Sequence, residues 1–234
     1  MSDTGPLGLS MRTGLVLFGF TLVFTALMAF TYGATRDIIA ASIEAEKLKL
    51  VNEILPPEAY DNAPLSDFAR LPPVAALGLE EPSRVFRARK GGVPVALLIE
   101  AIARDGYGGD IRLLVAVHAR GQLAGVRVTA HKETPGLGYY VDIRKDRNKA
   151  HPWITQFNDK GFEQVAEPLW RVNKDGGAFA HVTGATISSR AVTHAVGRAL
   201  KFATANRERL FAAEDWYDEG AAAGNAPPPE KEGS

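Results

Sequence analysis

Hydrophobic residues crowd the N-terminal part of the chain before any alternating pattern begins. Residues 13–35 contain no charged side chain. As a helix rising about 1.5 Å per residue they would extend about 35 Å, enough to cross the core of a bilayer. A cleaved signal peptide is the alternative, but its apolar core is usually only about 7–15 residues long. We therefore predict a short tail over residues 1–12 and one retained transmembrane helix over residues 13–35.

The next stretch mixes apolar and charged residues with a partly helical period. Its apolar positions are Ile38, Ile39, Ile43, Leu48, Val51, Ile54 and Leu55. Two consecutive prolines, Pro56 and Pro57, should end the helix. We predict a helical stalk over residues 36–57 that either lifts the following domain off the membrane or docks on partner subunits. A solvated amphipathic connector is the alternative, and the pattern does not separate the two.

Alternation of apolar and polar residues, which is typical of β-strands, begins near residue 84. We predict strands over residues 84–89, 93–99, 111–118 and 123–130, separated by turns that include Gly91-Gly92 and Arg120-Gly121-Gln122. Several prolines and little periodicity indicate a loop over residues 56–83. The strands together predict an antiparallel sheet.

A second helical period runs from Ser188 to about Leu210, with small alanines on its apolar face that permit close packing on the sheet. The expected fold class is therefore α+β: a transmembrane helix and a stalk, then a domain over residues 58–211 in which helices pack on an antiparallel sheet. Residues 212–234 are rich in Ala, Gly, Pro and Glu. We predict that this tail is disordered.

Composition excludes several kinds of site. The chain has 27 basic and 27 acidic residues, so no basic excess points to nucleic acid. It has no cysteine, which rules out disulfides and Cys-ligated zinc or iron–sulfur centres. Its five histidines do not have the spacing of metal ligands, and no catalytic Ser/His/Asp arrangement, P-loop or dinucleotide fingerprint is present. We therefore predict no metal site, no catalytic residue and no binding of NADH by this chain itself.

Small and hydroxyl residues gather at the junction before the second helix. The stretch reads Thr183-Gly184-Ala185-Thr186-Ile187-Ser188-Ser189. The amides at the start of the helix and its dipole favour a phosphate here, and the small side chains would let a bulky group approach Thr186. The alternative is that Thr186 or Ser188 merely caps the helix, as hydroxyl residues often do.

A second unusual stretch is the loop that reads His131-Lys132-Glu133-Thr134-Pro135-Gly136-Leu137-Gly138. Its proline and glycines favour a tight backbone with few side chains in the way, which could lie against a flat ring. Glu133 is the one acid in this loop. An ordinary turn with a solvated charge is the alternative.

These two stretches resemble the signatures of the FMN-binding domain family, and Lys174-Asp175-Gly176-Gly177 matches a third. The resemblance implies that FMN is bound covalently through a phosphoester to Thr186. Over residues 10–210 the chain is similar to the RnfG family of the Rnf/Rsx electron transport complexes. The cofactor-binding residues that the resemblance implies are Thr186, Thr183, Gly184, Ala185, Ser188, Glu133, Thr134, Gly136 and Leu137.

The same resemblance implies a function and a location. The chain would be an electron-carrying flavoprotein subunit of a membrane complex that couples electron transfer between ferredoxin and NAD⁺ to ion translocation. It would cross the bacterial inner membrane once, with the N-terminus cytoplasmic and the large domain periplasmic. Its partners would be membrane lipid, the other membrane and peripheral subunits, and a flavin transferase, since nothing in the sequence activates a threonine as a nucleophile.

Two other functions remain open from the sequence. One is a protein like the C-subunit of a Na⁺-translocating NADH:quinone reductase. The other is a membrane-anchored scaffold that has lost its flavin. The second is motivated by Ala180, which occupies the position where the family usually has an Asp, six residues before the modified threonine.

Overall fold

The N-terminal part of the chain is one continuous helix, α1 (Pro6–Ile54). The computed structural model describes residues 6–212. Residues 6–12 of the predicted N-terminal tail belong to α1, and the predicted C-terminal tail lies outside the described residues except for Ala212. Ser10–Ile54 of α1 is long and apolar enough to cross a membrane. The chain divides into two compact units, residues 1–49 and residues 50–234. No break in the helix separates the predicted transmembrane and stalk segments.

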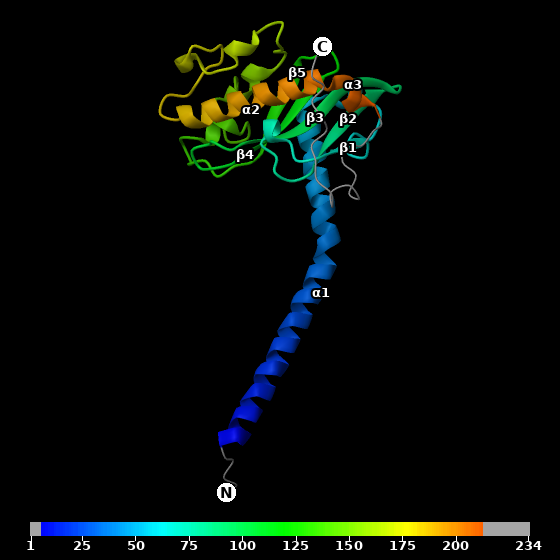
Figure 1. Cartoon of the computed structure of the whole chain (residues 1–234), viewed down its shortest axis with the longest axis vertical. Coiled ribbons are helices and arrows are strands. Elements are labelled where there is room, and N and C mark those ends of the chain that lie inside the picture. Colours follow the sequence, from blue (N-terminus) through cyan, green and yellow to red (C-terminus); the bar gives the residue numbers. More distant parts are fainter. Residues whose placement is uncertain (1–5, 213–234) are drawn as a thin grey trace, which may run out of the picture. The chain divides into compact units, whose positions relative to one another are not determined.

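The second unit is built on a five-stranded antiparallel sheet in the order β1-β2-β3-β4-β5 (Figure 1). The strands are β1 (Phe68–Leu71), β2 (Ser83–Lys90), β3 (Val93–Ala103), β4 (Ile111–His118) and β5 (Leu123–Ala130). The predicted antiparallel sheet and α+β class are confirmed. Each strand pairs with its sequence neighbour, so short turns suffice to connect most of them.

The expectation of a continuous loop over residues 56–83 is wrong at β1. This strand has only four residues, Phe-Ala-Arg-Leu, and pairs with β2 from Phe68 opposite Phe86 to Leu71 opposite Ser83. Such a short segment between prolines contains too few residues to show a period of two. Its burial nevertheless alternates, with Ala69 and Leu71 buried.

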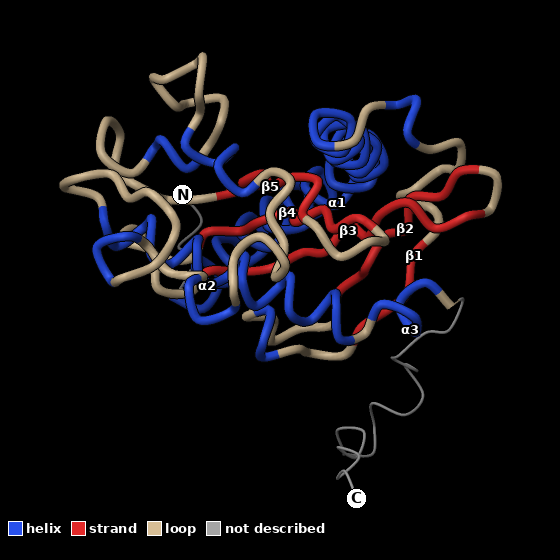
Figure 2. The backbone as a smooth tube through the Cα atoms, turned by 90° about the horizontal axis from the view of Figure 1, so that it is seen from above, coloured by secondary structure: helices blue, strands red, loops and turns tan. Residues whose placement is uncertain are grey.

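Side chains that alternate along the strands fill two separate cores. Leu97 and Ile99 of β3 contribute to one core, and Ala96 and Leu98 contribute to the other. Successive residues of a strand face opposite sides of a sheet, so the two cores lie on opposite faces. The helix α2 (Thr186–Ala205) packs on the first face, as Figure 2 shows, and is followed by the short helix α3 (Arg207–Phe211).

The second face is covered by the last turn of α1 and the residue after it. Leu50, Val51, Ile54 and Leu55 are buried against this face of the sheet. The C-terminal turn of the helix therefore belongs to the core of the domain. Pro56 and Pro57 follow directly, so the helix ends where the sequence predicted.

A buried arginine fixes this helix end to β5. The Nε of Arg127 donates to the Glu53 carboxylate at 3.0 Å, and its Nη2 donates to the Glu53 carbonyl at 2.7 Å. A helix end leaves carbonyl groups without intrahelical donors, and the guanidinium supplies one. Gly125 on the same strand gives Ile54 room, because a Cβ there would lie 2.9 Å from the Ile54 side chain.

We predict that Arg127→Ala lowers the free energy of unfolding of the domain by about 2 kcal/mol, since charged hydrogen bonds are lost and Glu53 is left in a partly buried place. Urea unfolding of the detergent-solubilised chain, followed by tryptophan fluorescence, measures this. The matched control is Arg104→Ala, whose ion pairs with Glu80 and Asp110 are exposed. Arg104→Ala should lower the free energy of unfolding by less than about 1 kcal/mol. Equal costs for the two variants would contradict the anchoring role.

Candidate functional site

A cavity of about 320 Å³ lies at the start of α2 and brings together four segments of the chain. They are the loop at Tyr107, the loop around Glu133, the turn at Lys174 and the stretch from Gly184 to Ser188. The lining residues are Tyr107, Glu133, Thr134, Leu137, Gly138, Lys174, Gly184, Ala185, Thr186, Ile187 and Ser188. Cavities of this size are typical of sites for small molecules and cofactors.

The helix α2 begins at Thr186, and Ala185 is its N-cap residue with no side-chain cap hydrogen bond. The alternative that Thr186 or Ser188 serves as a hydroxyl cap is therefore wrong. Gly184, just before, has a φ of +85°, a conformation that favours glycine. The first amides of α2 consequently have no side-chain acceptor at the N-cap position, and this end of the helix favours an anion.

Glu133 is almost fully buried, at 4% exposure, beneath three glycines. A Cβ on Gly138 would lie 2.4 Å from the Glu133 carboxylate, and one on Gly106 would lie 2.9 Å from it. A Cβ on Gly108 would meet the carbonyl of Lys132 at 2.2 Å. The bare backbone of these glycines therefore makes the space in which the carboxylate sits. The idea that Glu133 is a solvated loop charge is wrong.

The carboxylate connects two loops to the first turn of α2. Ser188 donates its hydroxyl to Oε2 at 2.5 Å, and the amide of Gly108 donates to Oε1 at 3.0 Å. A negative charge beside the first turn of a helix is favoured by the helix dipole. Glu133 thus holds the helix start, and with it Thr186, in place.

A second set of hydrogen bonds fixes the residue before Thr186. The hydroxyl of Tyr140 donates to the Ala185 carbonyl at 2.9 Å and lies 2.6 Å from the Ser189 hydroxyl oxygen. The Ser189 oxygen also accepts from the amide of Val182 at 3.2 Å. Burial raises the pKa of the Tyr140 hydroxyl to about 12. Tyr140 therefore remains a neutral donor over the physiological range.

The third segment contributes a positive charge. Lys174 lines the cavity, and the neighbouring Asp175 forms a two-pronged ion pair with Arg190 of α2 at 2.5 and 2.8 Å. Gly177 packs on the backbone of Arg171, where a Cβ would lie 2.0 Å from a carbonyl oxygen. The guanidinium of Arg190 is thereby held by Asp175.

The structure brings together most of the residues that the sequence singled out, but not all. Thr134, Leu137, Ala185 and Thr186 line the cavity along with Glu133, Gly184 and Ser188. Thr183 does not line it, and Gly136 lines a neighbouring hollow. Ser188 points its hydroxyl at Glu133 rather than leaving it free.

Tyr107 and Ile187 are lining residues that sequence reasoning left out. Both have large apolar side chains that remain exposed, by 69% and 47%. Leu137, which was predicted, is also 55% exposed and lines the same cavity. The sequence did contain a signal for Tyr107: it is an aromatic residue among the glycines of the loop over residues 105–110.

Ala180 lies outside this cavity. It lines a different hollow with Asn148, His151 and Gln156, and its amide donates to the Gln156 side chain at 2.7 Å. The carbonyl of Ala180 accepts from the Trp153 indole at 2.8 Å. The backbone at this position is therefore fixed by side chains from another segment, although the family's acidic side chain is missing.

Comparison with known proteins agrees with this geometry. Residues 106–201 match the model of the FMN-binding domain, and residues 10–54 match that of the RnfG N-terminal region. The chain is 42% identical to the G-subunit of the ion-translocating oxidoreductase complex of Shewanella amazonensis, covering 90% of this chain and 95% of that protein. It is 42% identical to the protein of the same name from Pseudomonas aeruginosa, over 88% and 94% of the two chains. The Vibrio cholerae protein of that name is 38% identical, over 85% and 92%.

We predict that Tyr140→Phe removes a high-pH phase from the ultraviolet titration of tyrosinate. Burial raises the pKa of Tyr140 from 10.0 to about 12, so the folded state keeps a proton that the unfolded state loses. The contribution to stability is present below pH 10 and is lost as the pH rises toward 12. Tyr107→Phe, which removes an exposed hydroxyl, is the control. Loss of the same phase in both variants would contradict the buried hydrogen-bonded hydroxyl.

We also predict that Glu133→Ala lowers the free energy of unfolding by about 2 kcal/mol, because the buried Ser188 hydroxyl and the partly buried Gly108 amide lose their acceptor. Glu133→Gln should lower the free energy of unfolding by less, since the glutamine side-chain oxygen can still accept one of these two hydrogen bonds. Thermal or urea unfolding of the two variants tests this ranking. A larger loss for glutamine than for alanine would show that the carboxylate does not act as an acceptor.

Proposed function

This chain belongs to the RnfG family of ion-translocating oxidoreductase complexes, and we propose that it is the FMN-carrying electron relay of such a complex. The observation that carries the proposal is the convergence of four segments on one cavity beside Thr186, at the start of α2. The family membership rests on identity over nearly the whole chain. It follows that other subunits carry the remaining steps of the electron path.

The residues that line the cavity fit FMN in both of its chemical parts. Tyr107, Leu137 and Ile187 offer apolar surface of the kind that a flat aromatic ring system contacts. Lys174 and the uncapped amides at the start of α2 offer positive charge for a phosphoryl group. The glycine-rich walls keep side chains out of the way. FMN would be the redox group, and the protein would orient it and set its electrostatic surroundings.

We infer further that the flavin is attached covalently, through a phosphoester to the Thr186 hydroxyl. Thr186 is partly exposed at the cavity wall, where an incoming phosphoryl group can reach it. The reaction with FAD would form the bond from the threonine oxygen to phosphorus, break the bond to the adenylate half and release AMP. A tethered flavin cannot diffuse away from a protein outside the cytoplasm.

A separate flavin transferase would supply the base for this step. Among the residues that the structure describes, no side chain accepts a hydrogen bond from the Thr186 hydroxyl. The acid in the cavity wall, Glu133, already accepts from Ser188 and Gly108. Threonine is a weak nucleophile without an adjacent base, so this chain alone is poorly equipped to attach its own flavin.

We propose that α1 crosses the bacterial inner membrane once and that the FMN-binding domain is periplasmic. The length and composition of α1 support a span. The charges beside the apolar run, Arg12 before it and Arg36 and Asp37 after it, are nearly balanced, so the proposed orientation rests on family membership alone.

We predict that Thr186→Ala abolishes covalent flavin, because the acceptor oxygen is removed, and that Thr186→Ser retains it. Fluorescence of the chain in a denaturing gel, from cells that produce a flavin transferase, measures this. Thr183→Ala is the matched control three residues away and should stay fluorescent. A fluorescent band from Thr186→Ala would contradict the assignment. A wild-type band without fluorescence would favour the alternative that this chain is a membrane-anchored scaffold that has lost its flavin.

We predict that Lys174→Gln lowers the midpoint potential of the attached flavin by roughly 30 mV, equivalent to about 1.4 kcal/mol for a two-electron couple. A positive charge in the cavity that holds the flavin, even one that contacts its phosphoryl group, stabilises the more negative reduced form through space. Spectroelectrochemical titration of the purified chain measures the shift. Lys160→Gln, an exposed lysine that does not line the cavity, is the control. An unchanged potential in Lys174→Gln would exclude an electrostatic role for Lys174.

A further inference from the structure

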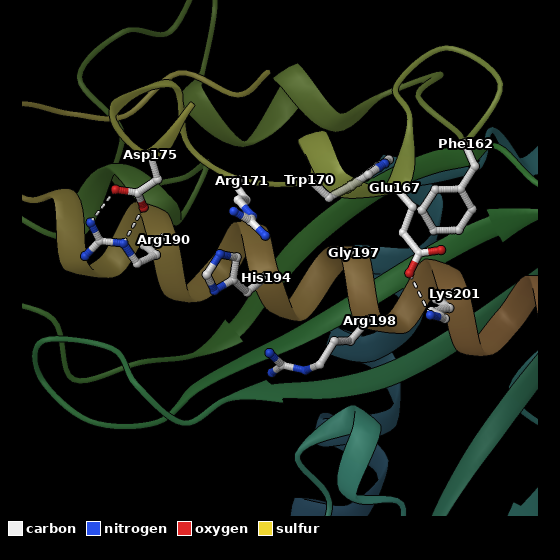
Figure 3. A pocket seen from close by; sticks show the side chains of 10 residues that line it. All are labelled: Phe162, Glu167, Trp170, Arg171, Asp175, Arg190, His194, Gly197, Arg198 and Lys201. Carbon is white, nitrogen blue, oxygen red and sulfur yellow. Dashed lines mark hydrogen bonds and ion pairs between the residues drawn. The ribbon is translucent and has the colours of Figure 1, made fainter. Parts of the chain in front are cut away.

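A second cavity, of about 530 Å³, follows the outer side of α2 and is separate from the one at Thr186 (Figure 3). One wall is a stripe on α2 at helical spacing: Arg190, His194, Gly197, Arg198 and Lys201. The other wall comes from the preceding segment and consists of Phe162, Glu167, Trp170, Arg171 and Asp175. The two walls together hold four Lys or Arg side chains and two carboxylates, which leaves this groove positively charged.

An ion pair closes each end of the groove. Asp175 holds Arg190 at one end, and Glu167 accepts from Lys201 at 2.6 Å at the other (Figure 3). Between them, Gly197 lets the buried Trp170 approach the helix, because a Cβ there would lie 3.2 Å from the Trp170 Cβ. Both carboxylates of the groove are thus used at its ends.

The middle of the groove is rich in nitrogen donors. Arg171 and His194 lie there in Figure 3, with Arg198 on the same stretch of helix. Among the residues that the structure describes, no carboxylate forms an ion pair with Arg171 or Arg198. Arg198 donates its Nε to the Ala76 carbonyl at 3.0 Å, which positions the guanidinium without neutralising it.

The pKa of His194 responds to the charges around the groove. Burial is the largest cause that lowers the pKa of His194 from its ordinary value. Among the charges, Asp105 has the largest effect and raises the pKa, Arg198 and Arg190 lower it, and Asp175 raises it. The imidazole is therefore neutral at pH 7.5 and would still offer one N–H. An anion bound beside it would offset the two arginines and draw the pKa upward.

We propose that this groove binds a phosphoryl group through Arg171, Arg198 and His194. Guanidinium groups present forked N–H donors that match phosphate oxygens, and such charge-assisted hydrogen bonds are the strong ones. No described carboxylate neutralises these two guanidinium groups. Their two positive charges therefore match a phosphate dianion better than they match a ligand with a single carboxylate. The phosphoryl group could belong to a free phosphate compound or to the headgroup of an anionic lipid, and the two sources share this recognition chemistry.

The site is distinct from the proposed flavin site. Lys174 lines the cavity at Thr186, whereas Asp175, the next residue, lines the groove. None of the ten groove residues lines the other cavity. The proposal therefore stands or falls independently of covalent FMN, and it is testable on chain that carries no flavin.

The test is a titration of the full chain in a phosphate-free detergent, followed through the imidazole resonances of labelled histidine. Inorganic phosphate at pH 7.5 is the first probe, and sodium chloride at equal ionic strength is the blank. A saturable shift of the His194 resonance is expected, with half-saturation in the millimolar range. The double variant Arg171→Gln/Arg198→Gln should weaken apparent binding at least tenfold. Arg104→Gln, an exposed arginine outside the groove, should leave it unchanged.

Two further probes identify the source of the phosphoryl group. A short-chain phosphatidylglycerol that shifts His194 where inorganic phosphate does not would assign the site to a lipid headgroup. A shift with either probe that the double variant abolishes supports the proposal. The resonances of the other four histidines verify that each variant is folded.

Several outcomes would overturn the proposal. These are an absence of saturation with both probes, an equal response in the double variant, or a response to sodium chloride as large as that to phosphate. An acidic peptide such as hexaglutamate that binds where neither phosphate probe does would also overturn it. That result would identify the groove as a surface for a protein partner instead.

Discussion

The arrangement of the site depends on one buried carboxylate. Glu133 lies beneath glycine backbone and accepts from Ser188 in the first turn of α2 and from the amide of Gly108. Burying a charge is unfavourable unless it is hydrogen-bonded, so these loops and the helix must stay together for the carboxylate to be satisfied. Tyr140 adds a second constraint through the Ala185 carbonyl. The threonine beside them is consequently held at a defined place on the cavity wall.

The sheet provides the platform on which these loops converge. One face packs against α2, chiefly at β3 and β4, and the other face packs against the last turn of α1. Arg127 joins the helix end to β5, whose C-terminal end leads directly into the loop of Glu133. The last turn of α1 and the loop that would hold the flavin therefore both belong to one packed domain.

Much of this fold could be predicted from the sequence because its signals are local. β2 and β5 contain alternating apolar and polar residues, β3 and β4 are runs of mostly apolar residues, and glycines mark the turns between them, so β2 to β5 were expected near their true places. β1 was not, since four residues carry no usable period. The residues of the site were named through resemblance, but their roles depend on tertiary contacts. That Glu133 would be buried, that Ala185 rather than a hydroxyl residue would occupy the N-cap position, and that Tyr107 would join the cavity required the assembled loops.

The central claim is that Thr186 carries the flavin of a redox subunit. The most direct measurement is tandem mass spectrometry of flavin-containing peptides from the native chain, which places the phosphoryl group on a single side chain. The account predicts fragments that assign FMN to Thr186 alone. Assignment to Thr183, Ser188 or Ser189, or release of the flavin from every peptide on denaturation, would contradict it.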